Sequence, residues 1–317
     1  MPRSPLFPDA ASLTTAKCNV GNRGLGIIAG GGELPARVAA AGRAVGRSVF
    51  ILGLEGFADP AVLAPWPHQI VRLGAAGRIL ALLRDNGCED IVMIGPVRRP
   101  SLLNLRPDAE GARILARVGR AAFMGDDGLL AAVIKVLAEE GFRVIGAQEV
   151  MREATAPRGV LTQAGPDAQA MADIARAVEV VRLLGAADVG QGCVVQQGLV
   201  LAVEAIEGTD AMLARCAPLR RDGIGGVLVK LVKPGQDKRA DLPTIGPRTI
   251  RNVAAAGLRG LAFEAGTTIL AEREACVAAA DAAGLFLLGL DPETLTLSGV
   301  PVTSLPSARL QPEGEPP

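Results

Sequence analysis

Aromatic side chains and histidine are scarce in this 317-residue sequence. Aromatic residues make up 3% of the chain, with no Tyr and one Trp, so its core must be built from Ala, Val, Leu and Ile. Such a core is typical of helices packed on a parallel sheet. His68 is the only histidine and lies in a Pro-Trp-Pro-His run. This excludes a histidine-rich zinc site, and we expect His68 to be a loop residue without a catalytic role.

Paired cysteines, a charge excess and long apolar runs are also missing. The cysteines are scattered at Cys18, Cys88, Cys193, Cys216 and Cys276. An odd, scattered set does not form a disulfide framework and predicts reduced thiols in a cytoplasmic protein. Lys plus Arg and Asp plus Glu both number 33, which argues against a nucleic-acid partner because such proteins carry a basic excess. No apolar run approaches the roughly 18 residues that span a bilayer.

Strand-like and helix-like segments alternate through the first half of the chain. Short apolar runs at 25–29, 48–52, 91–95 and 143–145 predict strands, and helical periodicity appears at 34–45, 79–86 and 126–137. This alternation predicts an α/β fold whose first domain, residues 24–155, is Rossmann-like with a parallel sheet. Residues 1–23, which precede it, are expected to form a disordered leader.

The second half has a different pattern. Helices are predicted near 167–184, 210–215, 249–256 and 272–283, and strands at 193–196, 199–204, 227–231 and 285–290. Gln197-Gly198 separates two of these strands and predicts a hairpin. The antiparallel hairpin makes the predicted C-terminal domain, residues 156–292, a mixed α/β domain. The Pro-rich end, residues 293–317, is expected to be a disordered tail.

Gly30, Gly31 and Gly32 lie between the first predicted strand and the first helix. Such a turn allows backbone N–H groups to approach a phosphate at a helix N-terminus. The dinucleotide fingerprint is incomplete because Pro35 stands at its third glycine, although Glu55 lies roughly where a ribose-binding acid would be. The turn therefore predicts phosphate or nucleotide contact, with a purely structural tight turn as the alternative. An NAD-dependent oxidoreductase is the matching alternative function.

Two groups of acids occur at predicted helix starts. Asp126 and Asp127 open one helix, where capping is favoured over catalysis. Glu204, Thr209 and Asp210 occur where a strand ends and a helix begins, the edge at which α/β sheets bind ligands. For this second group, substrate contact and simple helix capping remain alternatives.

The segment at residues 230–246 carries the densest mixture of cations, amides and acids. Mg²⁺ takes oxygen ligands and is commonly held by one or two carboxylates beside a substrate phosphate, which suits Asp241. Lys233 and Arg239 are suited to neutralising phosphate oxygens. A solvated charged loop is the alternative, and the rigid Asp-Leu-Pro-Thr-Ile-Gly run at 241–246 argues against it.

Taken in order, these segments resemble the UDP-2,3-diacylglucosamine pyrophosphatases of lipid A biosynthesis, the family without a metallophosphoesterase fold. The resemblance rests on Leu-Gly-Ile-Ile-Ala-Gly-Gly-Gly-Glu-Leu-Pro at 25–35, Gly-Asp-Asp at 125–127, Ala-Thr-Ala-Pro-Arg-Gly at 154–159, Asp-Val-Gly-Gln-Gly at 188–192, residues 202–212 and residues 233–246. Each segment alone is a weak signal, but the ordered set extends from about residue 24 to 291.

The resemblance implies a Mg²⁺-dependent hydrolase that cleaves UDP-2,3-diacylglucosamine, a lipid-nucleotide, to 2,3-diacylglucosamine 1-phosphate (lipid X) and UMP. It implies a homodimer with substrate bound between the two domains, and it identifies Asp241 as the essential aspartate. We expect Asp241 to hold Mg²⁺ and Lys233 to act in catalysis. The expected substrate-binding residues are Gly30, Gly31, Gly32, Glu204, Thr209, Asp210, Gln236, Arg239 and Thr244. Asp237 or Glu204 is a candidate for orienting water.

The sequence departs from that family at two positions. Members carry Asn where this chain has Pro96 and can carry His where it has Gln148, so neither receives a role. Arg98, Arg99 and Arg106 suit either a peripheral contact with an anionic inner-membrane surface or a solvated loop, which is favoured. A non-catalytic nucleotide or lipid sensor is the remaining alternative function.

Overall fold

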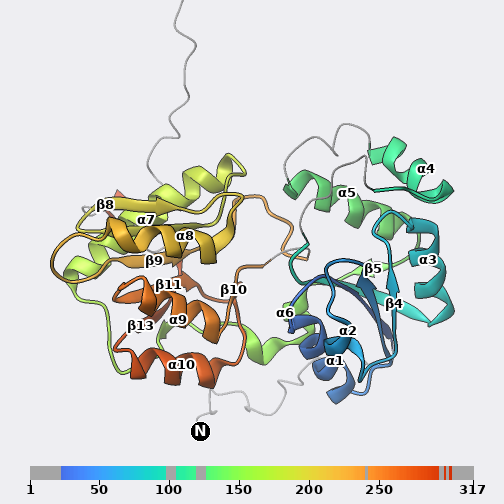
Figure 1. Ribbon diagram of the computed structural model, residues 1–317, viewed down its shortest axis with the longest axis horizontal. Helices are drawn as coiled ribbons and strands as arrows, with labels where there is room; N and C mark the ends of the chain where they lie inside the picture. The colour runs from blue at the N-terminus through green and yellow to red at the C-terminus, as the bar shows by residue number, and fades with distance from the viewer. Residues whose placement is uncertain are drawn as a thin grey trace, which may run out of the picture.

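The computed structural model describes residues 23–97, 105–118, 126–239 and 242–292, and the backbone of β14 (Thr296–Leu297) and β15 (Val300–Pro301). Figure 1 shows two lobes side by side, one built from the first half of the chain and the other from the second half. Most of the predicted leader (residues 1–23) and of the predicted tail (residues 293–317) lies outside the described residues, as do Arg98 and Arg99, while β14 and β15 lie within the predicted tail and pair antiparallel.

The sheet of the first lobe is entirely parallel in the described residues. Its strands are β1 (Gly24–Ala29), β2 (Val49–Leu54), β3 (His68–Val71), β4 (Cys88–Ile94) and β5 (Arg143–Val144), in the order β3-β2-β1-β4-β5. The order reverses between β1 and β4, which is the topological switch point of a Rossmann-like sheet. The predicted parallel-sheet domain is therefore confirmed.

Helices cover both faces of this sheet. One face packs against α1 (Leu34–Ala44), α2 (Pro60–Leu63) and α6 (Ala147–Val150). The other packs against α3 (Ala76–Asp85) and α5 (Asp126–Glu139), with α4 (Ala109–Val118) lying against both helices. Because both faces are covered, strands such as β1 are apolar along their whole length.

The sheet of the second lobe is mixed, as predicted. Its strands are β6 (Gly159–Val160), β7 (Gly192–Gln196), β8 (Leu199–Val203), β9 (Val227–Lys230), β11 (Gly260–Glu264) and β13 (Phe286–Leu290), in the order β6-β13-β11-β9-β7-β8. The three central strands β13, β11 and β9 are parallel, whereas β6 and β7 run antiparallel to their neighbours. Helix α7 (Ala168–Ala186) covers one face, and α8 (Gly208–Cys216), α9 (Pro247–Ala255) and α10 (Arg273–Ala282) cover the other.

The predicted hairpin joins β7 and β8. Its turn residues Gln197 and Gly198 have φ values of 54° and 77°, the double positive φ that suits the twist of a two-residue hairpin. The buried carboxylate of Asp173 on α7 accepts both of their backbone N–H groups, at 3.1 and 2.7 Å. The hairpin is thereby anchored to the helix that covers it.

The two lobes contact each other through the segments that follow the first sheet and β9. Strand β10 (Thr244–Ile245) pairs with β12 (Ile269–Leu270), and both Leu242 and Ile269 are buried in the core cluster of the first lobe. Arg37 on α1 forms a 2.7 Å ion pair with Glu272 at the start of α10. The chain between the lobes includes a short 3-10 turn, η3 (Arg152–Ala154), and Ala156, which is 1% exposed. The segment that joins the lobes is therefore packed.

Two sequence-based expectations need correction or completion. His68, expected in a loop, is the first residue of the edge strand β3 and pairs with Ile51. Its Nδ1 lies 2.8 Å from the carbonyl oxygen of Trp66. The strands β3 and β11 were not predicted, and β11 is central to the second sheet. In the described residues, no helix has both the length and the apolarity to cross a membrane.

Candidate active site

A cavity of about 750 Å³ opens at one edge of the second sheet. Its lining comes from residues 231–236 and 238 after β9, residues 264–266 at and after the end of β11, and residues 291–292 after β13. Residues 156–158 between the lobes and Arg182 on α7 complete it. The carboxyl ends of parallel strands meet at this edge, so their loops converge where α/β sheets bind ligands.

More basic than acidic side chains line the cavity. Arg158, Arg182, Lys233 and Lys238 are basic, and Glu264 and Asp291 are acidic, which leaves an excess of two positive charges. Arg158 and Asp291 lie 3.8 Å apart, a loose surface pair. An excess of cations in a concave site raises the local concentration of anionic ligands. The cavity therefore suits a polyanion such as a diphosphate.

Lys233-Pro234-Gly235-Gln236 forms a tight turn at the cavity. The N–H of Gln236 donates to the carbonyl of Lys233 at 3.1 Å, and Gly235 has a φ of 78°. Proline at the second turn position and glycine with positive φ at the third are the residues that this type of turn requires. The side-chain Oε1 of Gln236, a residue that is 8% exposed, accepts the Lys233 N–H at 3.2 Å. Both predicted site residues, Lys233 and Gln236, thus line the cavity in a locally determined turn.

The turn rests on the C-terminal end of α7. A Cβ added to Gly185 would lie 2.7 Å from Cδ of Pro234 and 3.2 Å from Cα of Lys233. Only glycine allows this close approach. The Lys233 ammonium then reaches Asp188, just beyond the helix, with Nζ 2.6 Å from Oδ1. Helix α7 therefore sets the position of the lysine.

Glu204 and Thr209 form a buried cluster with Lys230 at the same sheet edge. The Thr209 hydroxyl donates to Oε1 of Glu204 at 2.6 Å, and Nζ of Lys230 donates to that hydroxyl at 2.5 Å. The side chains of Lys230 and Glu204 are 5% and 8% exposed. Oε2 of Glu204 is buried and has no hydrogen-bond partner among the described residues. Glu204 and Thr209 lie beside α8 and do not line the cavity.

Two more predicted site residues of the second lobe, Asp210 and Thr244, also lie outside the cavity lining. Asp210 accepts a 2.8 Å hydrogen bond from Asn252 and forms a 2.8 Å ion pair with Arg248, both on α9. The Thr244 hydroxyl donates to the carbonyl of Leu242 at 3.2 Å. These contacts lie within the fold, so the structure brings neither residue to the cavity wall.

Arg239 and Asp237 form a bidentate ion pair next to the cavity. Nε and Nη2 of Arg239 donate to the two carboxylate oxygens of Asp237 at 2.9 and 2.6 Å. These hydrogen bonds from Arg239 outweigh partial burial and hold the pKa of Asp237 below its ordinary value. Both carboxylate oxygens of Asp237, a candidate for orienting water, therefore accept hydrogen bonds from Arg239.

In the first lobe, the glycine turn packs against the loop after β4. Gly30 N–H donates to the carbonyl of Ile94 at 2.8 Å, and Gly31 N–H donates to that of Pro96 at 3.0 Å. A Cβ on Gly30 would lie 2.4 Å from the carbonyl oxygen of Gly95. Two of the three turn amides thus have backbone partners, which favours a packing role for them, whereas Gly32 is exposed with a φ of 78°.

Comparison with known proteins agrees with this architecture. The sequence profile of the LpxI N-terminal domain matches residues 24–154, and that of the LpxI C-terminal domain matches residues 157–288. The chain belongs to the LpxI family. A curated relative, the UDP-2,3-diacylglucosamine pyrophosphatase LpxI of Caulobacter vibrioides, is 48% identical over 277 residues, which are 86% of this chain and 99% of the relative. The family resemblance inferred from the sequence is confirmed.

Some predicted residues of this LpxI-family chain cannot be placed. Asp241 lies outside the described residues, and so do the side chains of Asp126 and Asp127. Among the residues that the structure describes, no three His, Cys, Asp or Glu side chains are grouped to hold a metal. The cavity does present the carboxylates of Glu264 and Asp291. That donor set fits, in kind, a Mg²⁺ ion that a substrate phosphate and water help to ligate.

Several cavity residues of the LpxI-family chain, and Asp188, which pairs with Lys233 of the cavity lining, were not assigned from the sequence. Arg158 and Asp188 occur within resembling segments, at 154–159 and 188–192, which was the available signal. Arg182 lies within the sequence of α7, where no motif marked it, and Glu264 is the last residue of β11, a strand that was not predicted. Lys238 was within the recognised segment without a role, and Gln148 on α6 donates to its carbonyl at 3.3 Å. That hydrogen bond connects the first lobe to the cavity wall.

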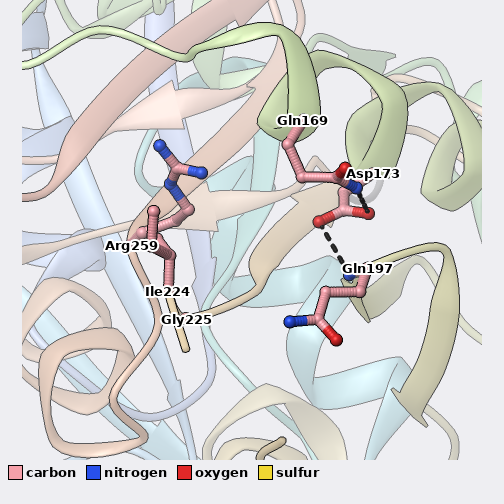
Figure 2. A pocket seen from close by; sticks show the side chains of 6 residues that line it. All are labelled: Gln169, Asp173, Gln197, Ile224, Gly225 and Arg259. Atoms are coloured by element: carbon pink, nitrogen blue, oxygen red, sulfur yellow. Dashed lines mark hydrogen bonds between the residues drawn. The ribbon is translucent and has the colours of Figure 1, made fainter. Parts of the chain in front are cut away.

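A smaller cavity of about 360 Å³ lies at the opposite, amino edge of the parallel strands. Figure 2 shows Asp173 beside Gln169 and Gln197, with Arg259 across the cavity. Besides the two hairpin amides, Asp173 accepts a 3.1 Å hydrogen bond from Gln169, while Arg259 pairs with Asp167 at 2.6 Å. These polar groups hold the hairpin and the start of α7, so we assign no ligand to this cavity.

Proposed function

We propose that this LpxI-family enzyme hydrolyses the diphosphate of UDP-2,3-diacylglucosamine in lipid A biosynthesis, giving 2,3-diacylglucosamine 1-phosphate (lipid X) and UMP. The observation that carries the proposal is the 48% identity along 99% of a relative named for the pyrophosphatase activity. The cation-lined cavity at the carboxyl edge of β9, β11 and β13 supports it, because a diphosphate is the anionic part of that substrate.

Hydrolysis of a phosphoanhydride requires charge stabilisation more than covalent catalysis. The oxygen of water forms a bond to phosphorus while the anhydride P–O bond breaks, and negative charge develops on the leaving phosphate. The side chain of Lys233 is 11% exposed and held in place, so its charge is little screened by solvent. Arg158 and Arg182 offer planar guanidinium groups that match phosphate oxygens.

We propose that Asp241 holds Mg²⁺, as the family resemblance implies. A bound Mg²⁺ supplies charge neutralisation on the phosphate oxygens. Gln236 lines the cavity and is proposed to bind substrate directly. A cavity of about 750 Å³ is small for a nucleotide with two acyl chains, so Glu204, Thr209, Asp210, Arg239, Thr244 and the Gly30–Gly32 turn would meet substrate beyond it.

We also propose a cytoplasmic homodimer, with a peripheral contact at the inner membrane as the alternative to the favoured solvated loop at Arg98, Arg99 and Arg106. Light scattering during size-exclusion chromatography tests the dimer. Co-sedimentation with anionic vesicles, compared between wild type and a variant with Arg98, Arg99 and Arg106 neutralised, tests the membrane contact.

The activity is tested by incubating the protein with UDP-2,3-diacylglucosamine, with Mg²⁺ or with EDTA, and following products by ³¹P NMR. We expect metal-dependent UMP and lipid X. Lys233→Met should lower kcat about 100-fold, the loss typical of one charge-stabilising donor. The exposed Lys135 on α5 provides the control, because Lys135→Met removes an equal charge away from the cavity. Binding without turnover would instead indicate a sensor, and neither binding nor turnover would refute the proposal.

A further inference from the structure

Helix α7 ends beside Lys233 in an unusual way. Its cap is Ala187, and the next residue, Asp188, has a φ of 52°. The N–H of Asp188 donates to the carbonyl of Gly185 at 3.0 Å, and the N–H of Val189 donates to that of Leu184 at 2.9 Å. These two bonds form the helix termination that ordinarily has glycine at the left-handed position. An aspartate therefore occupies a backbone position that suits glycine.

A non-glycine residue in the left-handed region is strained, and such strain points to a functional role when the side chain of that residue makes a specific contact. Asp188 has one, because its Oδ1 lies 2.6 Å from Nζ of Lys233, 45 residues away in sequence. The two side chains are 29% and 11% exposed, so the pair is largely shielded from solvent. The carboxylate is held rigidly by the helix end that also receives the Lys233 turn at Gly185.

We propose that Asp188 is a positioning residue that aims the Lys233 ammonium at the diphosphate. Its effect on turnover rests on the proposed function, but its effect on the lysine does not. The backbone of Lys233 is fixed by the turn on Gly185, and the flexible lysine chain still needs a second fixed point. The carboxylate of Asp188 supplies that point at the cost of a strained backbone.

The proposal and a purely structural role lead to opposite expectations for Asp188→Gly. Glycine relieves the left-handed strain, so the melting temperature should stay the same or rise. Loss of the carboxylate removes this fixed contact from the lysine, so kcat should fall about 10- to 100-fold. KM should not rise, because removing a negative charge makes the cavity more positive. A structural residue would instead lower the melting temperature.

The first experiment measures kcat, KM and melting temperature for Asp188→Gly, Asp188→Asn and Asp188→Glu. Asn should lose turnover as Gly does, and Glu should recover part of it because it restores the charge. Gln197→Gly is the matched control, since Gln197 is also left-handed, at a φ of 54°, and lies in the distant hairpin. Turnover of Asp188→Gly within about twofold of wild type would overturn the proposal.

The second experiment does not depend on turnover. Brief acetylation of the full-length protein, read by mass spectrometry at Lys233, reports how firmly its amine is held. Labelling should rise several-fold in Asp188→Gly and Asp188→Asn and stay unchanged in Gln197→Gly. Unchanged labelling at Lys233 would refute the positioning role. If wild type proves inactive, the proposed function fails, and this measurement still decides the role of Asp188.

Discussion

Replacing Gly185 with alanine should separate activity from stability. The new Cβ would meet Cδ of Pro234 at 2.7 Å, whereas ordinary contacts begin near 3.4 Å. The turn that carries Lys233 must therefore move by about 0.7 Å, because the helix on the other side is rigid. Misplacement by roughly 1 Å can cost about 100-fold in rate, so we expect kcat/KM to fall about 10- to 100-fold.

The same substitution has a small expected effect on stability. Alanine in place of glycine favours a helix by about 1 kcal/mol. Overpacking against the turn costs about 1 to 3 kcal/mol. The free energy of unfolding should thus fall by at most about 2 kcal/mol, and the protein should remain folded at assay temperature.

Gly42→Ala is the matched control for this prediction. Gly42 also lies near the end of a helix, α1, and its added Cβ would likewise meet a neighbour at 2.7 Å, the Cδ2 of Leu25. It should change the melting temperature comparably and leave kcat/KM unchanged. The assay is initial-rate release of UMP together with thermal denaturation. Turnover of Gly185→Ala equal to that of Gly42→Ala would refute the role of this contact in placing Lys233.

Three further predictions concern the metal, a buried ion pair and the thiols. Asp241→Asn should abolish Mg²⁺-stimulated turnover measured by ³¹P NMR, and near-normal turnover would rule out Asp241 as the metal ligand. Asp90 is buried, a condition that by itself raises its pKa, but hydrogen bonds from Arg143 and Arg47 hold the pKa below its ordinary value. The Asp90 carboxylate therefore stabilises the fold fully above about pH 4 and progressively less as the pH falls. Asp90→Asn should lower the free energy of unfolding by about 3 to 5 kcal/mol at pH 7. It should also weaken the loss of stability at acidic pH measured by urea denaturation, and an unchanged loss at acidic pH would contradict this role. Burial raises the pKa of Cys193 to about 12 and those of Cys88 and Cys276 to about 11. These thiols should react with a disulfide reagent at pH 8 only after denaturation, and rapid labelling of the native protein would contradict their burial.

Local signals predicted the elements that local chemistry determines. The Gln197-Gly198 turn was predicted because two residues with positive φ are needed between antiparallel strands. Helix α7 was predicted near residues 167–184, and the structure shows that Asp167 is its N-cap, whose carboxylate accepts the N–H of Ala170 at 2.8 Å. Strand β11 was missed because a five-residue strand between parallel neighbours is defined by those neighbours and has no turn signal of its own. His68 was misassigned because the two preceding prolines suggested a loop, whereas pairing with β2 makes it an edge-strand residue.

The α/β class and the two kinds of sheet follow from the composition and periodicity of the sequence, and the family follows from the ordered set of segments. Which charged groups share the cavity depends on tertiary packing. Lys233 and Asp291 meet because the loops after the parallel strands β9 and β13 converge at one sheet edge, and the inter-lobe segment and α7 bring Arg158 and Arg182 to that edge. Tertiary packing also decided that Glu204 and Thr209 pair with Lys230 and that Asp188 holds Lys233. Such contacts depend on packing between distant segments, which no local pattern encodes.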